Sequence, residues 1–304
     1  MLELIWSPEA AAARDARTPL VALESTIMTH GMPWPQNLAT ARLVEDDIRA
    51  AGAVPATIAV LNGHLHIGLS ADQMETLARS RDAAKLSRAD LALCLATGGS
   101  GATTVAATMI AARLAGIEVF ATGGIGGVHR GVADSFDISA DLQELAQTRV
   151  TVVCAGAKAI LDLPKTLEML ETLGVPVIAF GQDSLPAFWS ATSRLVAPQR
   201  LDSAAQIAAA HRMRAELGLP GGQLIANSIP PGDEIPLATL APMIERAQDA
   251  ARAQGITGKA VTPFLLAQLH ELSGGRTLRA NIALIRHNAR LGAAIARALC
   301  ETRP

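Results

Sequence analysis

The sequence predicts an α/β protein of one domain, residues 1–304, whose C-terminal part is helical. Short apolar segments alternate with helical patterns over residues 19–227, which is the rhythm of α/β folds. From residue 237 to the end only helix is expected, as the part of the same domain that covers residues 237–304. We find no repeat or linker, so residues 1–17 are expected to be an N-terminal extension of that domain.

In the first half, a β-hairpin is the clearest expected element. Two apolar segments, residues 56–61 and 64–69, are joined by Asn62-Gly63, and Asn-Gly favours the positive φ angles of a type I′ turn. The helix expected at 35–53 has proline near its first turn and glycine near its end. We also expect strands at 19–24, 91–96 and 117–121 and helices at 71–80 and 102–115.

The second half continues the alternation before the pattern becomes helical. Strands are expected at 150–154, 175–180 and 223–227, and a helix at 201–217. Residues 229–236 are rich in proline and predict an irregular surface segment.

Composition excludes several classes of function. Half of the chain is hydrophobic and 18% is charged, which excludes a disordered chain. The net charge of −2 shows no basic excess, so no nucleic-acid partner is expected. Cys94, Cys154 and Cys300 lie far apart and are expected to be reduced. We see no signal peptide and no apolar segment of bilayer length, so we expect a cytoplasmic enzyme with no membrane partner.

Two glycine-rich turns, residues 97–104 and 122–131, suggest a phosphate site. Glycines free backbone amides to bind anions, and the first turn leads into a helix whose N-terminus could hold phosphate. The second turn carries His129 and Arg130, whose side chains could donate to an anion. Neither turn is a complete dinucleotide fingerprint or a Walker loop, and glycine turns before helices are also common as purely structural features.

An acidic cluster follows the second turn. Asp137, Ser139 and Asp141 place three oxygen-bearing side chains within five residues. Such side chains suit a hard divalent ion, which needs only one or two protein carboxylates when a substrate phosphate lies nearby. The alternative is that Ser139 caps a helix over residues 140–147.

Three further residues are candidates for catalysis or binding. Glu24 ends the first expected strand, where ligands gather in α/β sheets, and is either an acid/base or a structural pairing partner. Lys158 lies among Ala, Gly, Ile and Leu; an apolar setting favours the free amine, which attacks carbonyl or anomeric carbons. Its alternative is a lysine that reaches solvent from a helix. Lys85 is either a solvated charge or a phosphate ligand.

Together these features indicate an enzyme that acts on a phosphorylated sugar. Several long blocks, in order, resemble the pseudouridine-5′-phosphate glycosidase family, and the resemblance extends from about Pro19 to Ala296. The blocks include residues 30–42, 52–60, 101–109, 120–131, 136–146, 152–158, 258–266 and 281–284. Ala159 departs from the family pattern, which often has serine there, but no matched catalytic position is lost.

The resemblance implies a lyase that reversibly cleaves the C–C glycosidic bond of pseudouridine 5′-phosphate, giving uracil and ribose 5-phosphate through a lysine Schiff base. It implies Glu24 as the proton donor, Lys158 as the nucleophile and Asp137 as the ligand of one divalent ion per subunit, typically Mn²⁺. The implied substrate contacts are Lys85, Val105, Ser139, Ala140 and Asp141, with His129 and Asn281 against the phosphate or the base. It also implies an α/β/α layered sandwich, with a central mixed, mostly parallel sheet, that assembles as a homotrimer.

Two other functions remain open at this point. A ribokinase-like sugar kinase would also use glycine turns and acidic residues, although no late glycine-rich anion hole followed by an aspartate is evident. A non-catalytic metabolite-binding protein of the same fold is the third hypothesis. The presence of Glu24, Asp137 and Lys158 together favours the enzyme.

Overall fold

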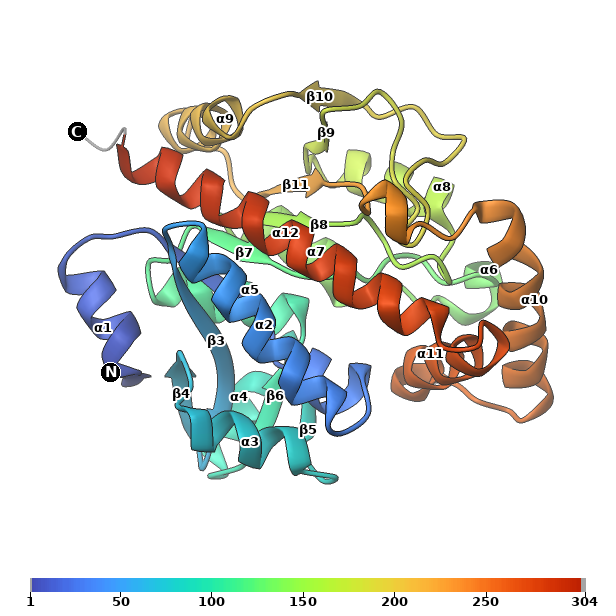
Figure 1. The fold of residues 1–304 in the computed structure, drawn as a ribbon, viewed down its shortest axis with the longest axis horizontal. Helices are drawn as coiled ribbons and strands as arrows, with labels where there is room; N and C mark the ends of the chain where they lie inside the picture. The colour runs from blue at the N-terminus through green and yellow to red at the C-terminus, as the bar shows by residue number, and fades with distance from the viewer. Residues whose placement is uncertain (1, 302–304) are drawn as a thin grey trace.

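A mixed, mostly parallel sheet of eleven strands forms the centre of the molecule (Figure 1). The computed structural model describes residues 2–301. The main path of the sheet has the order β1-β4-β3-β2-β7-β8-β11-β9-β10, and β6 pairs with β3 and β5 beside it. The strands are β1 (Leu4–Trp6), β2 (Leu20–Leu23), β3 (Val54–Leu61), β4 (His64–Ile67), β5 (Ala84–Leu86), β6 (Gly101–Thr103), β7 (Val119–Ala121), β8 (Thr151–Cys154), β9 (Val177–Phe180), β10 (Gln199–Leu201) and β11 (Gln223–Ala226).

Most neighbouring strands run parallel. From β3 through β2, β7, β8, β11, β9 and β10 every pairing is parallel, whereas β3 pairs antiparallel with β4 and β6. The parallel strands are apolar on both faces, as a sheet covered by helices on both sides requires; all four residues of β8 and of β11 are buried. The predicted sheet type is confirmed.

Helices cover both faces of this sheet (Figure 1). The 26-residue helix α12 crosses one face over β2, β7 and β8, with α2 and α9 beside it, while α5 and α7 pack together on the other face. The helices are α1 (Pro8–Asp15), α2 (Gln36–Ala50), α3 (Ala71–Arg79), α4 (Arg88–Ala96), α5 (Val105–Leu114), α6 (Val132–Ser135), α7 (Ala140–Gln147), α8 (Leu163–Thr172), α9 (Ala204–Glu216), α10 (Leu237–Ala253), α11 (Val261–Leu272) and α12 (Arg276–Glu301), with short η1 (Ile27–Gly31), η2 (Pro231–Asp233) and η3 (Gly258–Ala260). None of the helices in residues 2–301 is long and apolar enough to cross a bilayer.

The predicted hairpin is confirmed. Strands β3 and β4 pair antiparallel, with Leu61 opposite His64. Both turn residues have positive φ, 51° at Asn62 and 75° at Gly63. The helical C-terminal part is confirmed as well, since α10, η3, α11 and α12 occupy most of the chain beyond residue 237.

One predicted strand, residues 91–96, is wrong, because this segment belongs to α4. The backbone N–H of Ser87 donates to the Asp90 carboxylate at 2.9 Å, which caps the helix. Leu91 and Cys94, three residues apart, are buried, whereas Leu93 is 67% exposed, and that is helical rather than strand periodicity. A short apolar segment cannot by itself separate the two structures.

The sequence also missed short strands. Strands β5 and β6 pair in parallel, and β5 carries Lys85. The expected N-terminal extension includes β1, which pairs with β4 and so joins the sheet, and α1, which packs on β2 and β3. Strands of three residues give too little alternation to be recognised in a sequence.

Candidate active site

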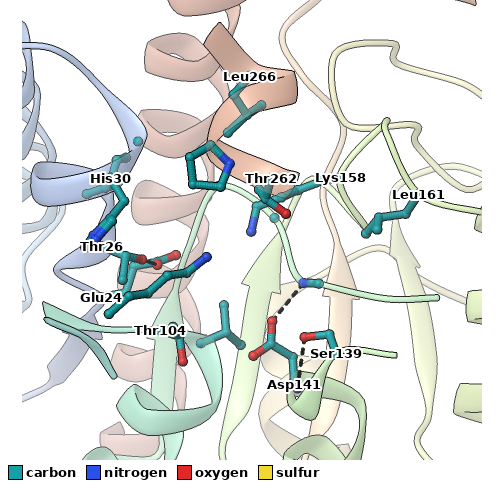
Figure 2. Close-up of a pocket in the computed structure, with 18 of the residues that line it drawn as sticks. Glu24, Thr26, His30, Thr104, Ser139, Asp141, Lys158, Leu161, Thr262 and Leu266 are labelled. Carbon is teal, nitrogen blue, oxygen red and sulfur yellow. Dashed lines mark hydrogen bonds between the residues drawn. The ribbon is translucent and has the colours of Figure 1, made fainter. Parts of the chain in front are cut away.

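A cavity of about 400 Å³ lies at the carboxyl ends of β2, β7 and β8. Ligands of parallel α/β sheets bind at this edge. Helix α11 contributes Thr262, Pro263 and Leu266 to its wall (Figure 2). Each of the ten predicted site residues lines the cavity: Glu24, Lys85, Val105, His129, Asp137, Ser139, Ala140, Asp141, Lys158 and Asn281. Arg130, suggested as an anion donor, is exposed and is not among the described residues that line it.

Glu24 is held by hydroxyl groups on both of its oxygens. Thr26 donates to Oε2 and Thr122 donates to Oε1. Thr122 is fully buried at the start of the second glycine turn, so this contact ties the end of β2 to the end of β7. The carboxylate therefore has a fixed position in the cavity wall, next to Thr26 and His30 in Figure 2.

The second glycine turn also positions Lys158. Past the ends of β7 and β8 the two segments of the chain continue side by side. The backbone N–H of Ala155 donates to Gly123 O at 2.9 Å, and the backbone N–H of Lys158 donates to Ile125 O at 3.1 Å. Lys158 then extends into the cavity from the side opposite Glu24 and His30 (Figure 2). Lys158 therefore lies in an ordered loop beyond a strand rather than on a solvent-facing helix, contrary to the structural alternative.

Asp141 joins three elements of the site. Ser139 is the N-cap of α7, as the capping hypothesis predicted, and its hydroxyl accepts from Asp141 N–H. The Asp141 carboxylate accepts from Ala106 N–H in the first turn of α5 at 3.0 Å and from Gly126 N–H at 2.8 Å. A side chain of the protein therefore supplies one negative group to the N-terminus of α5, and the phosphate site expected there stays a prediction.

Close packing by itself requires glycine at two positions of the second glycine turn. A Cβ built on Gly126 would lie 2.3 Å from Ser139 Oγ, and one on Gly124 would lie 2.6 Å from the Phe188 ring. Both distances are shorter than real Cβ contacts, so these positions need glycine.

Two histidines lie at the cavity among cationic groups. The backbone N–H of His129 donates to the backbone oxygen of Asp137 at 3.0 Å, and the imidazole Nδ1 of His129 lies 3.9 Å from the Asp137 carboxylate. Burial lowers the pKa of His129; Asp137 opposes this effect, while Lys158 and Lys85 reinforce it. Burial, with Lys85, also lowers the pKa of His30. Both imidazoles are therefore biased toward the neutral form.

Cys154 is excluded as a nucleophile. It is fully buried at the end of β8, and burial raises the pKa of its thiol to about 12. At neutral pH this thiol stays protonated, and only the thiolate is reactive.

Sequence reasoning missed several residues of the site. His30 and Thr122 lie inside the blocks that carried the resemblance, so the signal was present but was not assigned a role. Phe188 lines the cavity from a segment without any recognised motif, and its neighbour Trp189 donates to Asn281. Nothing in the sequence pattern around these two aromatic residues indicated a site.

Comparison with known proteins shows the family to which the chain belongs. Residues 9–298 match the family described as Indigoidine synthase A like protein. The pseudouridine-5′-phosphate glycosidase of Jannaschia sp. (strain CCS1) is 70% identical over 298 residues, covering 98% of this chain and 99% of that protein. The protein with the same name from Roseobacter denitrificans is 68% identical, covering 98% of this chain and 96% of that protein.

Solved structures share the fold at similar coverage. The prealnumycin C-glycosynthase AlnA, solved in complex with ribulose 5-phosphate, superposes with a TM-score of 0.91 at 40% identity, over 98% of this chain and 97% of that one. An indigoidine synthase A-like protein from Thermotoga maritima gives a TM-score of 0.89 at 33% identity, over 98% and 97% of the two chains.

The fold and the cavity therefore define an α/β protein of the Indigoidine synthase A like family. Within it, the chain belongs to the pseudouridine-5′-phosphate glycosidases.

Proposed function

We propose that this protein reversibly cleaves pseudouridine 5′-phosphate to uracil and ribose 5-phosphate. The observation that carries the proposal is the placement of Lys158 and Glu24 on opposite sides of one cavity of about 400 Å³. An amine and a carboxyl group held in place are the nucleophile and the proton carrier that a covalent route to C–C cleavage needs. Relatives that are 57–70% identical carry the name of this activity.

The bond to be broken explains why an amine is needed. Uracil leaves a C-glycoside as a carbanion equivalent, which is a poor leaving group. Lys158 Nζ bonds to C1′ while the C1′–O4′ bond breaks, and O4′ takes a proton from Glu24. The amine on C1′ returns one proton to the Glu24 carboxylate and keeps its lone pair for the next step.

Carbon–carbon cleavage then follows from protonation of the base. Uracil takes this proton from Glu24 at C5, the electrons of the C1′–C5 bond return to the base, and the nitrogen lone pair forms the C1′ iminium. Water adds to C1′ and gives one proton to Glu24. The new hydroxyl group then passes its proton to the lysine nitrogen, the C1′–N bond breaks, and the aldehyde of ribose 5-phosphate is released. The sum is one pseudouridine 5′-phosphate and one water giving uracil and ribose 5-phosphate.

The polar residues around Lys158 suit the phosphosugar. Lys85, His129 and Ser139 offer an ammonium group, an imidazole and a hydroxyl to the cavity, which are ordinary phosphate partners. Val105 and Ala140 line the wall without polar side chains and set its shape. Asp141 uses both carboxylate oxygens on backbone amides, so it contributes to the site mainly by holding Gly126 and α5 in place.

The Asp137 carboxylate suits one divalent ion, which we propose to be Mn²⁺. No three His, Cys, Asp or Glu side chains within residues 2–301 form a metal cluster, so the protein does not offer a complete cage. A hard ion held by one carboxylate would keep water ligands and take oxygens from the substrate, and the partly exposed Asp137 carboxylate at the cavity offers such a ligand. When bound, the ion would supply charge that orients the phosphosugar.

The first test measures uracil release from pseudouridine 5′-phosphate by chromatography. The reaction is run once with Mn²⁺ added and once with a chelator added. Metal-dependent uracil release is expected. Its absence from folded protein under both conditions would refute the proposed reaction, and equal release under both would refute the metal proposal.

The covalent step has its own test. Lys158→Ala should abolish turnover while substrate binding stays measurable, and borohydride should trap ribose 5-phosphate on the wild-type protein alone. Near wild-type turnover in this variant would eliminate the Schiff base. Lys165→Ala, at an exposed lysine of α8, is the matched control.

The assembly and the cellular location are also proposals. We propose a homotrimer, with light scattering after size-exclusion chromatography as the test, and a cytoplasmic protein, with cell fractionation as the test.

A further inference from the structure

One corner of the cavity differs from the rest in its chemistry. Phe188, Leu284 and Gly123 lie together there: a Cβ on Gly123 would be 3.3 Å from Leu284 Cδ1 and 4.0 Å from Phe188 Cε2. Leu284 is fully buried and Phe188 is 4% exposed. Asn281, one turn before Leu284 on α12, adds one amide to this apolar corner.

A buried tryptophan fixes the orientation of that amide. Trp189 Nε1–H donates to Asn281 Oδ1 at 2.6 Å, and Trp189 is 1% exposed. An indole N–H is a donor only, so the atom of Asn281 that faces it must be the oxygen. Asn281 lines the cavity, and because the amide is planar its Nδ2 is turned away from Trp189 and is left to donate to a ligand.

The segment that carries the two aromatic residues is held tightly. Ala187 and Ser190 form a two-way backbone bridge, with Phe188 and Trp189 at the turn between them. Phe188 has φ of 61°, a left-handed conformation that a bulky residue rarely adopts. Its N–H donates to Ala155 O at 3.0 Å, in the loop that leads to Lys158. Strain of this kind persists only where the surroundings enforce it, as they do at functional sites.

We propose that Trp189 is a positioning residue for a base subsite, formed by Asn281, Phe188 and Leu284, that binds a planar base through a ring carbonyl oxygen. An apolar corner with one N–H donor suits a flat heterocycle whose carbonyl accepts that bond, whereas a phosphate would be desolvated there without a charge partner. The identity of this base as uracil rests on the proposed function.

The test measures binding of each half of the substrate separately, by equilibrium dialysis with labelled uracil and with labelled ribose 5-phosphate. Binding is measurable whether or not the protein turns over, so the result does not depend on the proposed reaction. Trp189→Phe removes the N–H donor but keeps an aromatic ring, and Asn281→Asp replaces Nδ2 by an oxygen of equal size. Trp6→Phe, on the edge strand β1, is the matched control.

Trp189→Phe should raise the Kd of uracil about tenfold, the size expected from misplacing one hydrogen bond, and Asn281→Asp should raise it at least as much. The Kd of ribose 5-phosphate should change less than twofold in both, and the control should change neither. A general packing defect would instead weaken both ligands together. If Trp189→Phe does not fold, Asn281→Asp still decides.

A second arm tests the direction of the hydrogen bond. With an acceptor facing the base, Asn281→Asp should bind either cytosine or isocytosine better relative to uracil than the wild type does, because each replaces one carbonyl by an amine. Failure of wild-type protein to bind uracil, or an unchanged uracil Kd in both variants, would overturn the inference. Wild-type binding without turnover would instead refute the proposed reaction and leave this inference supported.

Discussion

Asp141→Asn tests whether one buried carboxylate holds the site together. Asp141 is 6% exposed, and its two oxygens accept from Ala106 N–H at 3.0 Å and from Gly126 N–H at 2.8 Å. Asparagine has the same shape, so the change creates no cavity. It replaces one oxygen by an NH₂ group that cannot accept, and one of the two backbone N–H groups loses its partner.

The expected loss follows from two terms. A hydrogen bond to a charged acceptor contributes about 1.5–3 kcal/mol, and a negative charge at a helix N-terminus contributes about 0.3–1 kcal/mol. Asp141→Asn should therefore lower the free energy of unfolding by about 3 kcal/mol. Whichever of the two amides is released, the contact that joins α5 to the turn beside Lys158 weakens. Turnover should therefore fall by about tenfold or more.

Urea denaturation, monitored by circular dichroism, measures the change in the free energy of unfolding, and uracil release measures the change in turnover. Asp72→Asn is the matched control, since Asp72 lies in the first turn of α3 but is exposed. It should lower the free energy of unfolding only by the helix-terminus term, about 0.3–1 kcal/mol. If Asp141→Asn unfolds at the wild-type urea concentration with the same slope, the positioning role of Asp141 is wrong.

Three further predictions follow from the same geometry. Gly126→Ala should destabilise by about 1–3 kcal/mol in urea denaturation, because its Cβ would meet another atom at 2.3 Å; Gly232→Ala, with nothing within 4 Å, should be neutral, and equal effects would contradict the packing argument. Burial lowers the pKa of His30 below its usual 6.5, so the unfolded chain binds more protons, and stability should rise with pH through the range just below 6.5. His30→Gln should flatten that rise in urea denaturation series measured at several pH values, and a steeper rise in His30→Gln would contradict the sign assigned here. Glu24→Gln should slow uracil release by about 10²–10⁴-fold with folding unchanged, and a wild-type rate would remove Glu24 as the proton carrier.

Much of the fold was predictable because its signals are local. The Asn62-Gly63 turn specifies its hairpin through two positive φ angles, and Ser139 specifies the start of α7 through one capping bond. The strand predicted at 91–96 is wrong because a run of six apolar residues fits the repeat of a buried helix as well as that of a strand. The segment is helical because the Ser87–Asp90 contact caps its start and because the helix buries only one of its faces.

The residues of the site were predictable as a set, although their contacts were not. Glu24, Asp137 and Lys158 stood out by residue type and by the blocks around them, and the structure brings them to one cavity. The contact between the N-terminus of α5 and Asp141 was not predicted, because Asp141 lies on a different element, 35 residues along the chain from Ala106. Such a pairing depends on how the two segments pack.

The sequence by itself determined the class of fold, the hairpin, the helical C-terminal part and the chemical types available for catalysis, since periodicity, turn residues and side-chain chemistry are carried by neighbours in the chain. Only the tertiary structure decided that Thr122 holds Glu24, that Asp141 ties α5 to Gly126, and that Trp189 orients Asn281 across 92 residues of chain. These contacts depend on which segments the sheet brings side by side, and no local pattern encodes a distance between remote residues.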